Sequence, residues 1–425
     1  MLLRDPIHGD IELNSLETAV LDLPVMQRLR GIKQLGTAHL VYPGALHTRF
    51  DHSVGVCAVA HRIVANLRRL GVQISAELED AIGVAALLHD VTHVPFGHTL
   101  EDERRLFARH DKGSRLADLF AGELGHALGR LGVRDVVARL LGLPASEAVP
   151  RWAQDIVSGS IDADLLDYLR RDSFFTGLAH DYDDRILRCF AEHGERLVIR
   201  LVKHGMDRPD ARSEIIGVLR LRYFLTERVY YHHTKVVAGA MISKAVEIAL
   251  DHGVLVESDL LRFNDWTLLE HLAQCGVADA AALARRTLNR DLLKRGYVVS
   301  GRSVPLAQRE AWVARYHASR IHRAQAEAEL AGRLGVPFAD VVVYCPALSA
   351  MKEACVPVET RRGLEYLNDA GSEAFAEIGA LQERYADLWR FYVFVPAHAV
   401  EHAASIAADL FGMRGELTAN SPIRQ

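Results

Sequence analysis

Apolar residues recur every three or four positions through most of the chain, which is the spacing that predicts helices with a buried face. The helices that this spacing predicts span residues 16–23, 58–70, 76–90, 114–131, 133–142 and 236–254. Asn14 and Ser15 can cap the first helix, and the Gly-Leu-Pro run at 142–144 marks a stop. The pattern therefore predicts a mainly α fold.

The pattern changes near residue 340, where β-branched and aromatic residues gather in short runs typical of strands. These runs span residues 339–348, 356–367 and 388–397, and a helical spacing follows at 398–413. We therefore expect a large helical core and a smaller C-terminal mixed α/β lobe. We place the divisions at 1–250 for the core, 251–335 for a helical extension and 336–425 for the lobe.

The composition is ordinary for a soluble globular protein: 49% of the 425 residues are hydrophobic and 25% are charged. A formal net charge of −5 gives no overall attraction to nucleic-acid phosphates, so nucleic acid stays an open partner. Five scattered cysteines without a CxxC pair indicate buried thiols in a reducing compartment. No window approaches the roughly 20 apolar residues that cross a bilayer, so we expect a cytoplasmic protein without a membrane partner.

Histidines and aspartates are placed where they can share a metal ion. His52, the adjacent His89 and Asp90, and later Asp164 provide a mixed nitrogen and oxygen set suited to one divalent transition metal. The apolar run before His89 predicts a buried helix, and a charged aspartate at its end must be paired or bound to metal. A hydrogen-bonded His–Asp pair in the core is the alternative that these residues alone leave open.

Further histidines surround this pair. His93 falls four residues after His89, which on a continuing helix places both on one face. Pro95 and Gly97 then break the helix and allow His98 to return toward the same cavity. Four ligands or proton carriers within ten residues predict a reaction centre.

Five motifs follow one another along the chain: DPIHGDIELN, QRLRGIKQLG, HTRFDHSVGV, HDVTHVPFGH and IDADLLDYLRRD. In this order and spacing the chain resembles the dNTP triphosphohydrolases of the HD superfamily, especially those like the sterile-alpha-motif and HD-domain enzyme of animals and its bacterial relatives. The resemblance is strong over residues 5–177 and weak to residue 247. It implies an HD-type metal-dependent phosphohydrolase core over residues 1–250, with no sterile-alpha-motif domain expected before it.

The resemblance implies roles for the histidines and aspartates. The metal ligands that it implies are His52, His89, Asp90 and Asp164. Asp90 also belongs to the implied catalytic residues, together with the histidines near the scissile phosphate, which are His93, His98 and His110. We expect His98 to be the general acid. The metal would be Mn, Fe, Co, Ni or Zn, since the same ligands hold each of them, with Mg²⁺ on the triphosphate of the substrate.

The resemblance also implies residues that contact a dNTP substrate. They are Arg49 at the triphosphate, Gln34 and Leu35 at the deoxyribose, Asp172 at the 3′-hydroxyl, Tyr168 against C2′, and Tyr230 and Arg222 beside the base. Arg49 has an alternative as an ion-pair partner of Asp51 or Glu101. Leu165 stands where the family commonly has a phosphate-binding lysine, and Tyr231 where it has a glutamine, which leaves substrate affinity and base preference open.

An activator site is implied as well. Asp22, Gln27 and Arg30 match the residues that hold a guanine nucleotide, and Arg185 matches a basic residue used for activator phosphates. Arg4 replaces an asparagine often found in the neighbouring pocket. An ordinary polar helix surface is the alternative for these residues. If the site is real, we expect dGTP or GTP to activate the enzyme through assembly of a homodimer or homotetramer.

Three functions remain at this stage. The first is a dNTP triphosphohydrolase, which releases deoxynucleoside and triphosphate. The second is an HD phosphohydrolase that acts on nucleoside mono- or diphosphates or on nucleotide analogues. The third is a nucleotide-sensing scaffold without turnover. The residues Val91, Thr92 and His93 after the His-Asp pair disfavour alarmone hydrolases and cyclic-dinucleotide phosphodiesterases.

Overall fold

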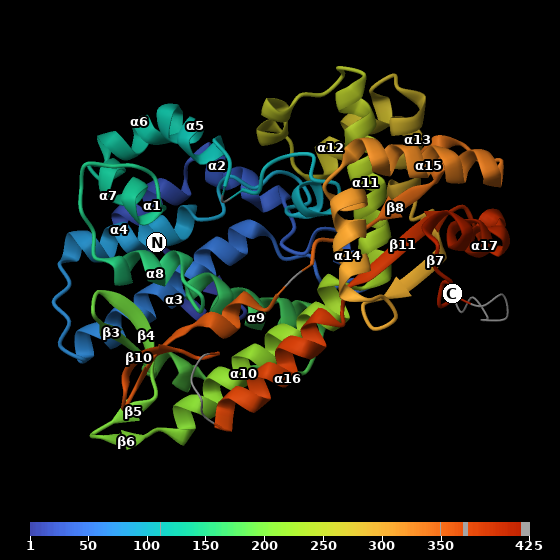
Figure 1. Cartoon of the computed structure of the whole chain (residues 1–425). Helices are drawn as coiled ribbons and strands as arrows, with labels where there is room; N and C mark the ends of the chain where they lie inside the picture. The colour runs from blue at the N-terminus through green and yellow to red at the C-terminus, as the bar shows by residue number, and fades with distance from the viewer. Residues whose placement is uncertain (111, 349, 369–372, 418–425) are drawn as a thin grey trace.

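A computed structural model describes residues 1–110, 112–348, 350–368 and 373–417, and it confirms a mainly helical fold (Figure 1). The α-helices are α1 (Ser15–Leu21), α2 (Pro24–Gln27), α3 (Arg49–Arg69), α4 (Ala76–Leu88), α5 (Arg115–Ala121), α6 (Glu123–Arg130), α7 (Arg134–Leu140), α8 (Arg151–Ser158), α9 (Ala163–Thr176), α10 (Pro209–Leu225), α11 (His233–Asp251), α12 (Asp265–Gln274), α13 (Ala278–Leu288), α14 (Leu306–Trp312), α15 (Arg320–Leu334), α16 (Glu373–Ala386) and α17 (Val400–Phe411). The strands are β1 (Leu2–Asp5), β2 (Gly9–Glu12), β3 (Phe190–His193), β4 (Arg196–Arg200), β5 (Val202–Lys203), β6 (Met206–Asp207), β7 (Lys294–Ser300), β8 (Val342–Tyr344), β9 (Pro357–Thr360), β10 (Gly363–Tyr366) and β11 (Arg390–Val395). No helix within these ranges is long and apolar enough to cross a membrane.

Helices α3 and α4 pack against each other at the centre of the N-terminal half, and α9 packs on α3. Helix α3 begins with a capping box in which Thr48 and Asp51 satisfy each other's backbone amides. Helix α4 begins at the side chain of Ser75 and is apolar over its last two turns, so it is buried there on all sides. The expected cap of α1 by Asn14 is present, as a capping box with Glu17.

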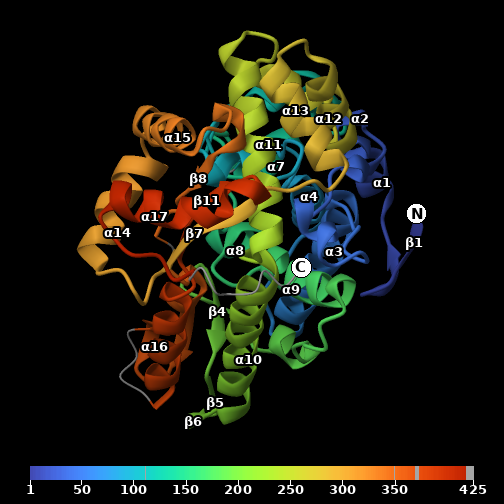
Figure 2. The ribbon, with the colours of Figure 1, turned by 90° about the vertical axis from the view of Figure 1, so that its right-hand side faces the viewer.

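A four-stranded sheet with the order β10-β9-β4-β3 lies beside this helical core. Strand β9 runs parallel to β4, with Ile199 opposite Val358, although the two strands are far apart in the sequence. Helices α10 and α16 run side by side next to the sheet (Figure 2). Residues from the C-terminal part of the chain therefore complete the core that the N-terminal half begins.

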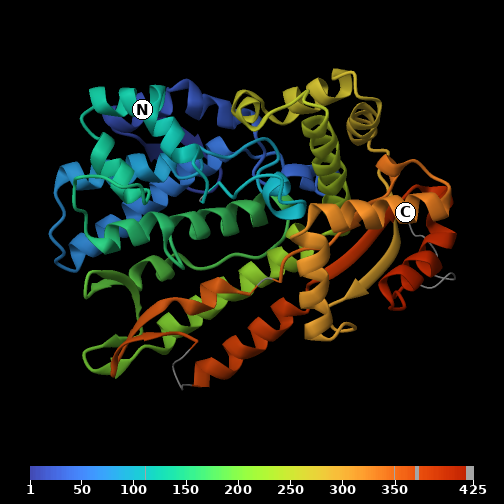
Figure 3. The ribbon, with the colours of Figure 1, turned by 45° about the horizontal axis from the view of Figure 1, so that its top comes forward.

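A second sheet, with the order β7-β11-β8, forms the C-terminal lobe (Figure 3). Alternate residues of β11 face opposite sides, as the period of a strand requires. Tyr392 and Phe394 pack in one hydrophobic cluster with residues of α11 and α13, and Phe391 and Val393 pack in another with residues of α14, α15 and α17. The expected strands within 339–348, 356–367 and 388–397 and the expected helix after 397 are all present.

The structure differs from the predicted elements in three places. Strand β7 lies inside the segment 251–335, for which we expected only helices, because its apolar run is short and gains its partner only from β11. The pair β3 and β4 lies inside the expected core. The single helix expected over 114–131 is divided into α5 and α6 at Gly122, whose backbone leaves the helical region.

Candidate metal centre and active site

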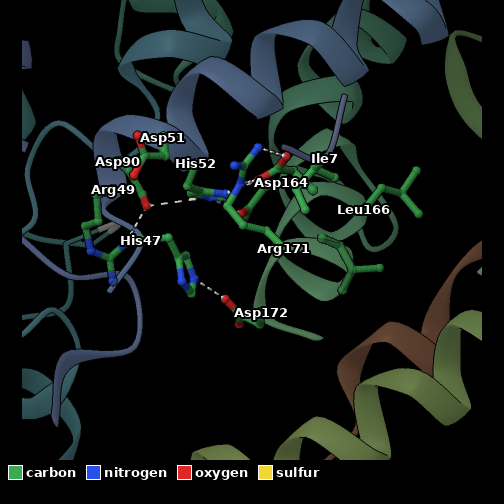
Figure 4. Close-up of polar contacts among 12 residues, drawn as sticks. Ile7, His47, Arg49, Asp51, His52, Asp90, Asp164, Leu166, Arg171 and Asp172 are labelled. Atoms are coloured by element: carbon green, nitrogen blue, oxygen red, sulfur yellow. Dashed lines mark hydrogen bonds and ion pairs between the residues drawn. The ribbon is translucent and has the colours of Figure 1, made fainter. Parts of the chain in front are cut away.

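Three helices bring the four expected ligands together. His52 lies in the first turns of α3, His89 and Asp90 follow the end of α4, and Asp164 lies in the first turn of α9. His52 Nε2 is 2.9 Å from Asp164 Oδ1, 3.2 Å from His89 Nε2 and 3.8 Å from Asp90 Oδ2. His52, His89 and Asp90 each offer a ligand atom within 4.8 Å of the others, and Figure 4 shows His52 between Asp90 and Asp164. The arrangement is that of a mononuclear centre open on one side, where Asp164 is partly exposed.

The ring orientation of both histidines suits metal binding. His52 Nδ1 is 2.7 Å from Asp167 Oδ2, and His89 Nδ1 is 2.8 Å from the carbonyl oxygen of Ala86. Since both partners accept, each Nδ1 carries a hydrogen, and loss of the proton from Nε2 leaves a lone pair directed at the cluster. Carboxylates and carbonyls behind histidine ligands fix the ring and raise its basicity in this way. The donor set therefore fits a divalent transition metal.

Asp167 is the centre of a buried network. Besides His52 it accepts from Arg171 Nε at 2.8 Å and lies 2.7 Å from His8 Nε2, and Arg171 Nη1 donates to Asp5 at 2.8 Å. Gly55 of α3 lies against Asp167 and Arg171 so closely that a Cβ would collide with both. The network gives the DPIHG motif a structural role, because Asp5 and His8 hold the residue that orients a metal ligand.

The electrostatics of the cluster favour a cation. Burial opposes the charged form of His52, but hydrogen bonds to Asp164 and Asp167 outweigh it and raise its pKa to about 10. Burial likewise opposes the charged form of Asp90, while Arg49 and His93 hold its pKa well below the usual range. The raised pKa of His52 and the anionic form of Asp90 both indicate that the cluster favours positive charge at neutral pH.

The three expected catalytic histidines lie beside the metal cluster: His93 stacks on His110, and His98 meets both rings edge to face. The ring of His93 is centred 3.8 Å from that of His110 and 4.8 Å from that of His98. Glu101 lies behind them: its Oε2 is 3.3 Å from His98 Nδ1 and 3.4 Å from His110 Nδ1, and Arg115 donates to its other oxygen at 2.9 Å. Glu101 therefore fixes two imidazoles with their Nε2 atoms directed away from it.

One detail of the expected histidine geometry is wrong. Helix α4 ends at Leu88, so His93 is not one helical turn beyond His89. The chain instead turns after Asp90, and His93 Nε2 lies 3.1 Å from Asp90 Oδ1. Pro95 cannot continue a helix, and Phe96 and Gly97 both adopt positive φ, so the backbone returns His98 to the cluster as expected.

Arg49 pairs with Asp90, and neither of its expected alternative partners contacts it. Asp51 caps α3, and Glu101 binds Arg115. Figure 4 shows the Arg49 side chain directed toward Asp90. The guanidinium is buried beside the metal cluster, where it adds positive charge close to any bound phosphate.

The expected sugar and base residues gather on the other side of Asp164. Asp172 Oδ1 is 2.8 Å from His47 Nε2, and Asp172 Oδ2 accepts from the Tyr230 hydroxyl at 2.7 Å. Arg222 lies 5.3 Å above the ring centroids of both Tyr168 and Tyr230. These side chains therefore contact one another in one connected group next to Asp164 on α9.

The other two expected sugar contacts come from the loop before α3. The backbone amide of Gln34 donates to the carbonyl oxygen of His47 at 3.0 Å, and the buried Gln34 Oε1 has no hydrogen-bond partner within the described part of the chain. Leu35 is buried. Gln34 thus lies beside the His47–Asp172 pair and keeps an acceptor for a ligand.

The residues expected at the activator site occupy the surface of α1, α2 and the turn after α2. Arg30 Nε donates to Gln27 Oε1 at 2.8 Å, and its guanidinium stacks 3.5 Å from the ring centroid of Phe50. Asp22 is exposed at the end of α1. Arg185 is exposed in a separate turn after α9, and Arg4 pairs with Asp10.

Sequence reasoning missed the residues that support the ligands: Asp167, Arg171, His8, His47 and Glu101. Four of them lie in the quoted motifs, which is the signal that could have found them: His8 in DPIHGDIELN, His47 in HTRFDHSVGV, and Asp167 and Arg171 in IDADLLDYLRRD. Glu101 lies outside these motifs, and its partners are known only once the chain is folded.

Comparisons with known proteins agree with the fold and the cluster. Residues 49–172 match the HD domain, and residues 217–421 match the HD associated region. An uncharacterized protein of Methanocaldococcus jannaschii is 33% identical over 304 residues, which cover 70% of this chain and 60% of that protein. The deoxynucleoside triphosphate triphosphohydrolase SAMHD1 of Bos taurus is 30% identical over 290 residues, which cover 59% of this chain and 48% of that enzyme.

The fold is shared with a solved phosphohydrolase of Bacteroides thetaiotaomicron, with a TM-score of 0.71 and 23% identity over 93% of this chain and all of that one. The helical core carries a His and Asp cluster that could hold a metal ion. With an HD domain followed by an HD associated region, the chain belongs to the HD-domain phosphohydrolase family. It spans about half to three-fifths of the length of the curated relatives described above.

Proposed function

We propose that this chain is a metal-dependent deoxynucleoside triphosphate triphosphohydrolase, which releases deoxynucleoside and triphosphate. The observation that carries the proposal is the order of residues on α9. Asp164, Tyr168 and Asp172 follow at intervals of four residues, so they lie on one face about 6 Å apart. The face leads from the metal cluster, past the tyrosine, to the His47–Asp172 pair, so a nucleotide whose α-phosphate lies at the cluster places its deoxyribose beside Tyr168 and Asp172.

His52, His89, Asp90 and Asp164 would hold the metal, which supplies Lewis acidity at the phosphoryl oxygen and a nucleophilic water. The imidazolium form of His98 donates its Nε2 proton to the departing 5′-oxygen, since Glu101 holds its Nδ1. Burial lowers the pKa of His98, and the hydrogen bond to Glu101 opposes that shift. Arg49 neutralises phosphate oxygens from the side of Asp90.

The sugar is selected at the middle of the α9 face. The phenol ring of Tyr168 fills the space beside C2′ and excludes a 2′-hydroxyl. Asp172, held by His47 and Tyr230, accepts from the 3′-hydroxyl. Gln34, Leu35 and Arg222 complete the walls for sugar and base.

A shorter phosphate chain is the second candidate substrate, and one residue favours it. Leu165 is buried and apolar at the position where the resembled enzymes carry a lysine for phosphate. A triphosphate therefore lacks one positively charged partner here. A nucleoside mono- or diphosphate, which carries less negative charge, loses less binding free energy by this change.

Regulation, assembly and cellular location complete the proposed function. We infer a guanine nucleotide activator at Asp22, Gln27 and Arg30, with Arg185 at its phosphates, and a homodimer or homotetramer as the active form. The similarity to SAMHD1 supports this inference. Free cysteines support a reducing, cytoplasmic location.

The proposal is tested by product analysis with dNTPs, NTPs and nucleoside mono- and diphosphates, each with Mn²⁺, Mg²⁺, Co²⁺ and Fe²⁺. We expect deoxynucleoside and triphosphate in equal amounts from dNTPs, and much lower kcat/KM for GTP than for dGTP. Release of single phosphates would favour the second candidate. Binding of nucleotides without any turnover would leave a nucleotide-sensing scaffold.

Substitution of the proposed ligands tests whether they bind the metal. Asp164→Ala and the double variant His89→Ala, Asp90→Ala should stay folded and lose both bound metal and turnover, because they remove ligands and the charge balance of the site. Asp210→Asn changes an exposed aspartate far from the cluster and should alter neither. Full metal occupancy with normal turnover in Asp164→Ala would disprove the proposed centre.

A further inference from the structure

Besides the cluster of His52, His89 and Asp90 and the neighbouring group of His93, His98, Glu101 and His110, the described residues contain a third group that could hold a metal ion, on another part of α3. Glu17 of α1 and Cys57 and His61 of α3 offer ligand atoms that lie within 4.8 Å of one another. His61 Nε2 is 2.6 Å from Glu17 Oε1, and Cys57 Sγ is 3.6 Å from the same oxygen. Glu17 and Cys57 are fully buried, whereas the His61 side chain keeps 29% of its exposure.

The residue types and their spacing suit a borderline-soft cation. Cys57 and His61 are four residues apart on a helix, so their side chains leave the same face one turn apart. Thiolate, imidazole and carboxylate are the three ligand types that zinc accepts in proteins. We propose that Glu17, Cys57 and His61 form a second divalent-metal site of the zinc class, which joins α1 to α3 and does not depend on the proposed catalysis.

The surroundings of the group are those of a metal site. His61 Nδ1 lies 3.5 Å from Glu79 Oε1 of α4, so the histidine has a carboxylate behind the ring nitrogen that faces away from Cys57. The other oxygen of Glu17 accepts from the Asn14 amide at 3.0 Å, which fixes the carboxylate. Two of the three ligands therefore have a partner that holds their orientation.

The backbone of α4 makes room for the group. Gly83 lies directly against it, and a Cβ at this position would collide with Glu17 Oε1 and approach His61 Nε2 to 3.0 Å. An alanine would be the better residue for a helix interior on propensity alone. The glycine thus leaves space at the point where a cation and its ligands would lie.

A path for the cation exists. Glu17, His61, Glu79 and Asp80 line a cavity of about 700 Å³ between α1, α3 and α4. Three of these four residues are acidic, so the cavity attracts a cation to the exposed edge of His61. Asp80 lies on the cavity wall and accepts from Asn14 Nδ2 at 2.9 Å.

Metal binding requires deprotonated ligands, so a cation bound here displaces any proton that Cys57 or His61 carries, and affinity rises with pH.

Cobalt reports this site separately from the catalytic one. The catalytic cluster contains no cysteine, so only the second site can give a thiolate-to-cobalt charge-transfer band. The full-length chain carrying His89→Ala and Asp90→Ala is freed of metal and titrated with Co²⁺ and with Zn²⁺. We expect one bound Co²⁺ with a thiolate band, and a rise in melting temperature with Zn²⁺.

Two variants and one control decide the outcome. Cys57→Ala should abolish the band and the rise in melting temperature, and Cys345→Ala, which removes a buried cysteine of the C-terminal lobe, should change neither. If Cys57→Ala does not fold, His61→Gln keeps a side chain that can reach Glu17 and should weaken Co²⁺ binding at least tenfold. No thiolate band in the parent protein, or a band that survives Cys57→Ala, would overturn the proposal.

Discussion

At the residue scale, the histidines divide into two groups by the acceptor behind each ring. His52 is held by Asp167, and His98 and His110 are held by Glu101. Under the proposed function, the first arrangement prepares a nitrogen to bind metal, and the second prepares nitrogens to exchange a proton with a substrate oxygen. The same imidazole chemistry would then serve two purposes at neighbouring positions.

The first prediction concerns the proton donor. His98→Ala should lower kcat by about two to four orders of magnitude, because the leaving oxygen then departs without a proton. Substrate binding should change much less, which steady-state kinetics with dGTP measures. His126→Ala removes an exposed histidine of α6 and is the matched control. An unchanged kcat in His98→Ala would assign the role to His93 or His110.

The sequence motifs suggested the proposed metal ligands but did not identify the residues that hold the site side chains in place. His52, His89, Asp90 and Asp164 lie in motifs whose order alone suggests a shared site. Glu101 is one acidic residue among three in a short stretch, and only folding shows which of them turns toward the histidines. Arg49 was assigned to phosphate by resemblance, and its contact with Asp90 depends on a turn that no local pattern encodes.

The second prediction concerns the contact between α3 and Asp167. Gly55→Ala should lower metal affinity by about 10- to 100-fold, since the added methyl displaces the carboxylate that orients His52. It should also lower the free energy of unfolding by about 1–3 kcal/mol through overpacking. Metal titration and urea denaturation measure the two effects.

Gly217→Ala in α10 is the control for helix propensity. No atom lies within 4 Å of the Cβ that it adds, among the residues described. It should stabilise the protein by about 0.4–1 kcal/mol and leave metal affinity unchanged. Equal behaviour of the two alanine variants would show that Gly55 has no role in orienting Asp167.

At the element scale, a buried ionic network joins three parts of the chain. Glu327 of α15 accepts from Arg104 Nη1 at 2.7 Å and from the backbone amide of Val343 at 2.9 Å, and Lys244 of α11 lies 3.1 Å from it. Arg104 directly follows the turn that carries Glu101. The network therefore connects the C-terminal lobe to the segment that holds the catalytic histidines.

The third prediction is a pH dependence of this network. Burial opposes the charged form of Glu327, but Arg104 and Lys244 outweigh it and lower its pKa to about 2. A carboxyl with a lowered pKa stabilises the fold above its unfolded pKa near 4.5, and the contribution is lost as the pH falls toward 2. Glu327→Gln should thus cost about 3–5 kcal/mol at pH 7 and less as the pH falls.

Urea denaturation at several pH values checks this prediction. Glu329→Gln on the exposed face of α15 is the control, and it should cost less than about 1 kcal/mol at every pH. A constant difference between wild type and Glu327→Gln from pH 7 to pH 3 would contradict the proposed titration.

Elements with local periodicity were predictable, and elements that depend on distant partners were not. Helices α3 and α4 and strand β11 show their spacing within a few residues. Strands β3, β4 and β7 are short and gain their hydrogen bonds from segments that the local pattern does not identify. The same reason explains why the expected boundary at residue 336 divides a single sheet, β7-β11-β8.

At the scale of the whole molecule, the fourth prediction concerns assembly. We expect dGTP or GTP to activate dATP hydrolysis by stabilising an oligomer through Asp22, Gln27 and Arg30. An effector shifts such an equilibrium only through different affinities for the two states, so loss of the guanine contacts should weaken assembly and activation together. Sedimentation and dATP turnover of wild type, Asp22→Ala and Arg30→Ala, with and without dGTP, measure both.

Metal binding should survive in these variants, because their side chains do not contact the cluster. If wild type assembles fully without nucleotide and dGTP leaves turnover unchanged, the surface of α1 and α2 has only a structural role. The role of Arg30 is then its stacking on the ring of Phe50.

The pairing of β9 with β4 has a consequence for synthesis in the cell. Val358 leaves the ribosome about 160 residues after Ile199, which at ordinary elongation rates is roughly ten to thirty seconds later. During that interval β4 has an open edge on the side that β9 will cover. A nascent chain of this protein therefore needs protection from aggregation at that edge, and a chaperone that binds extended segments would be most useful just before residue 358 emerges.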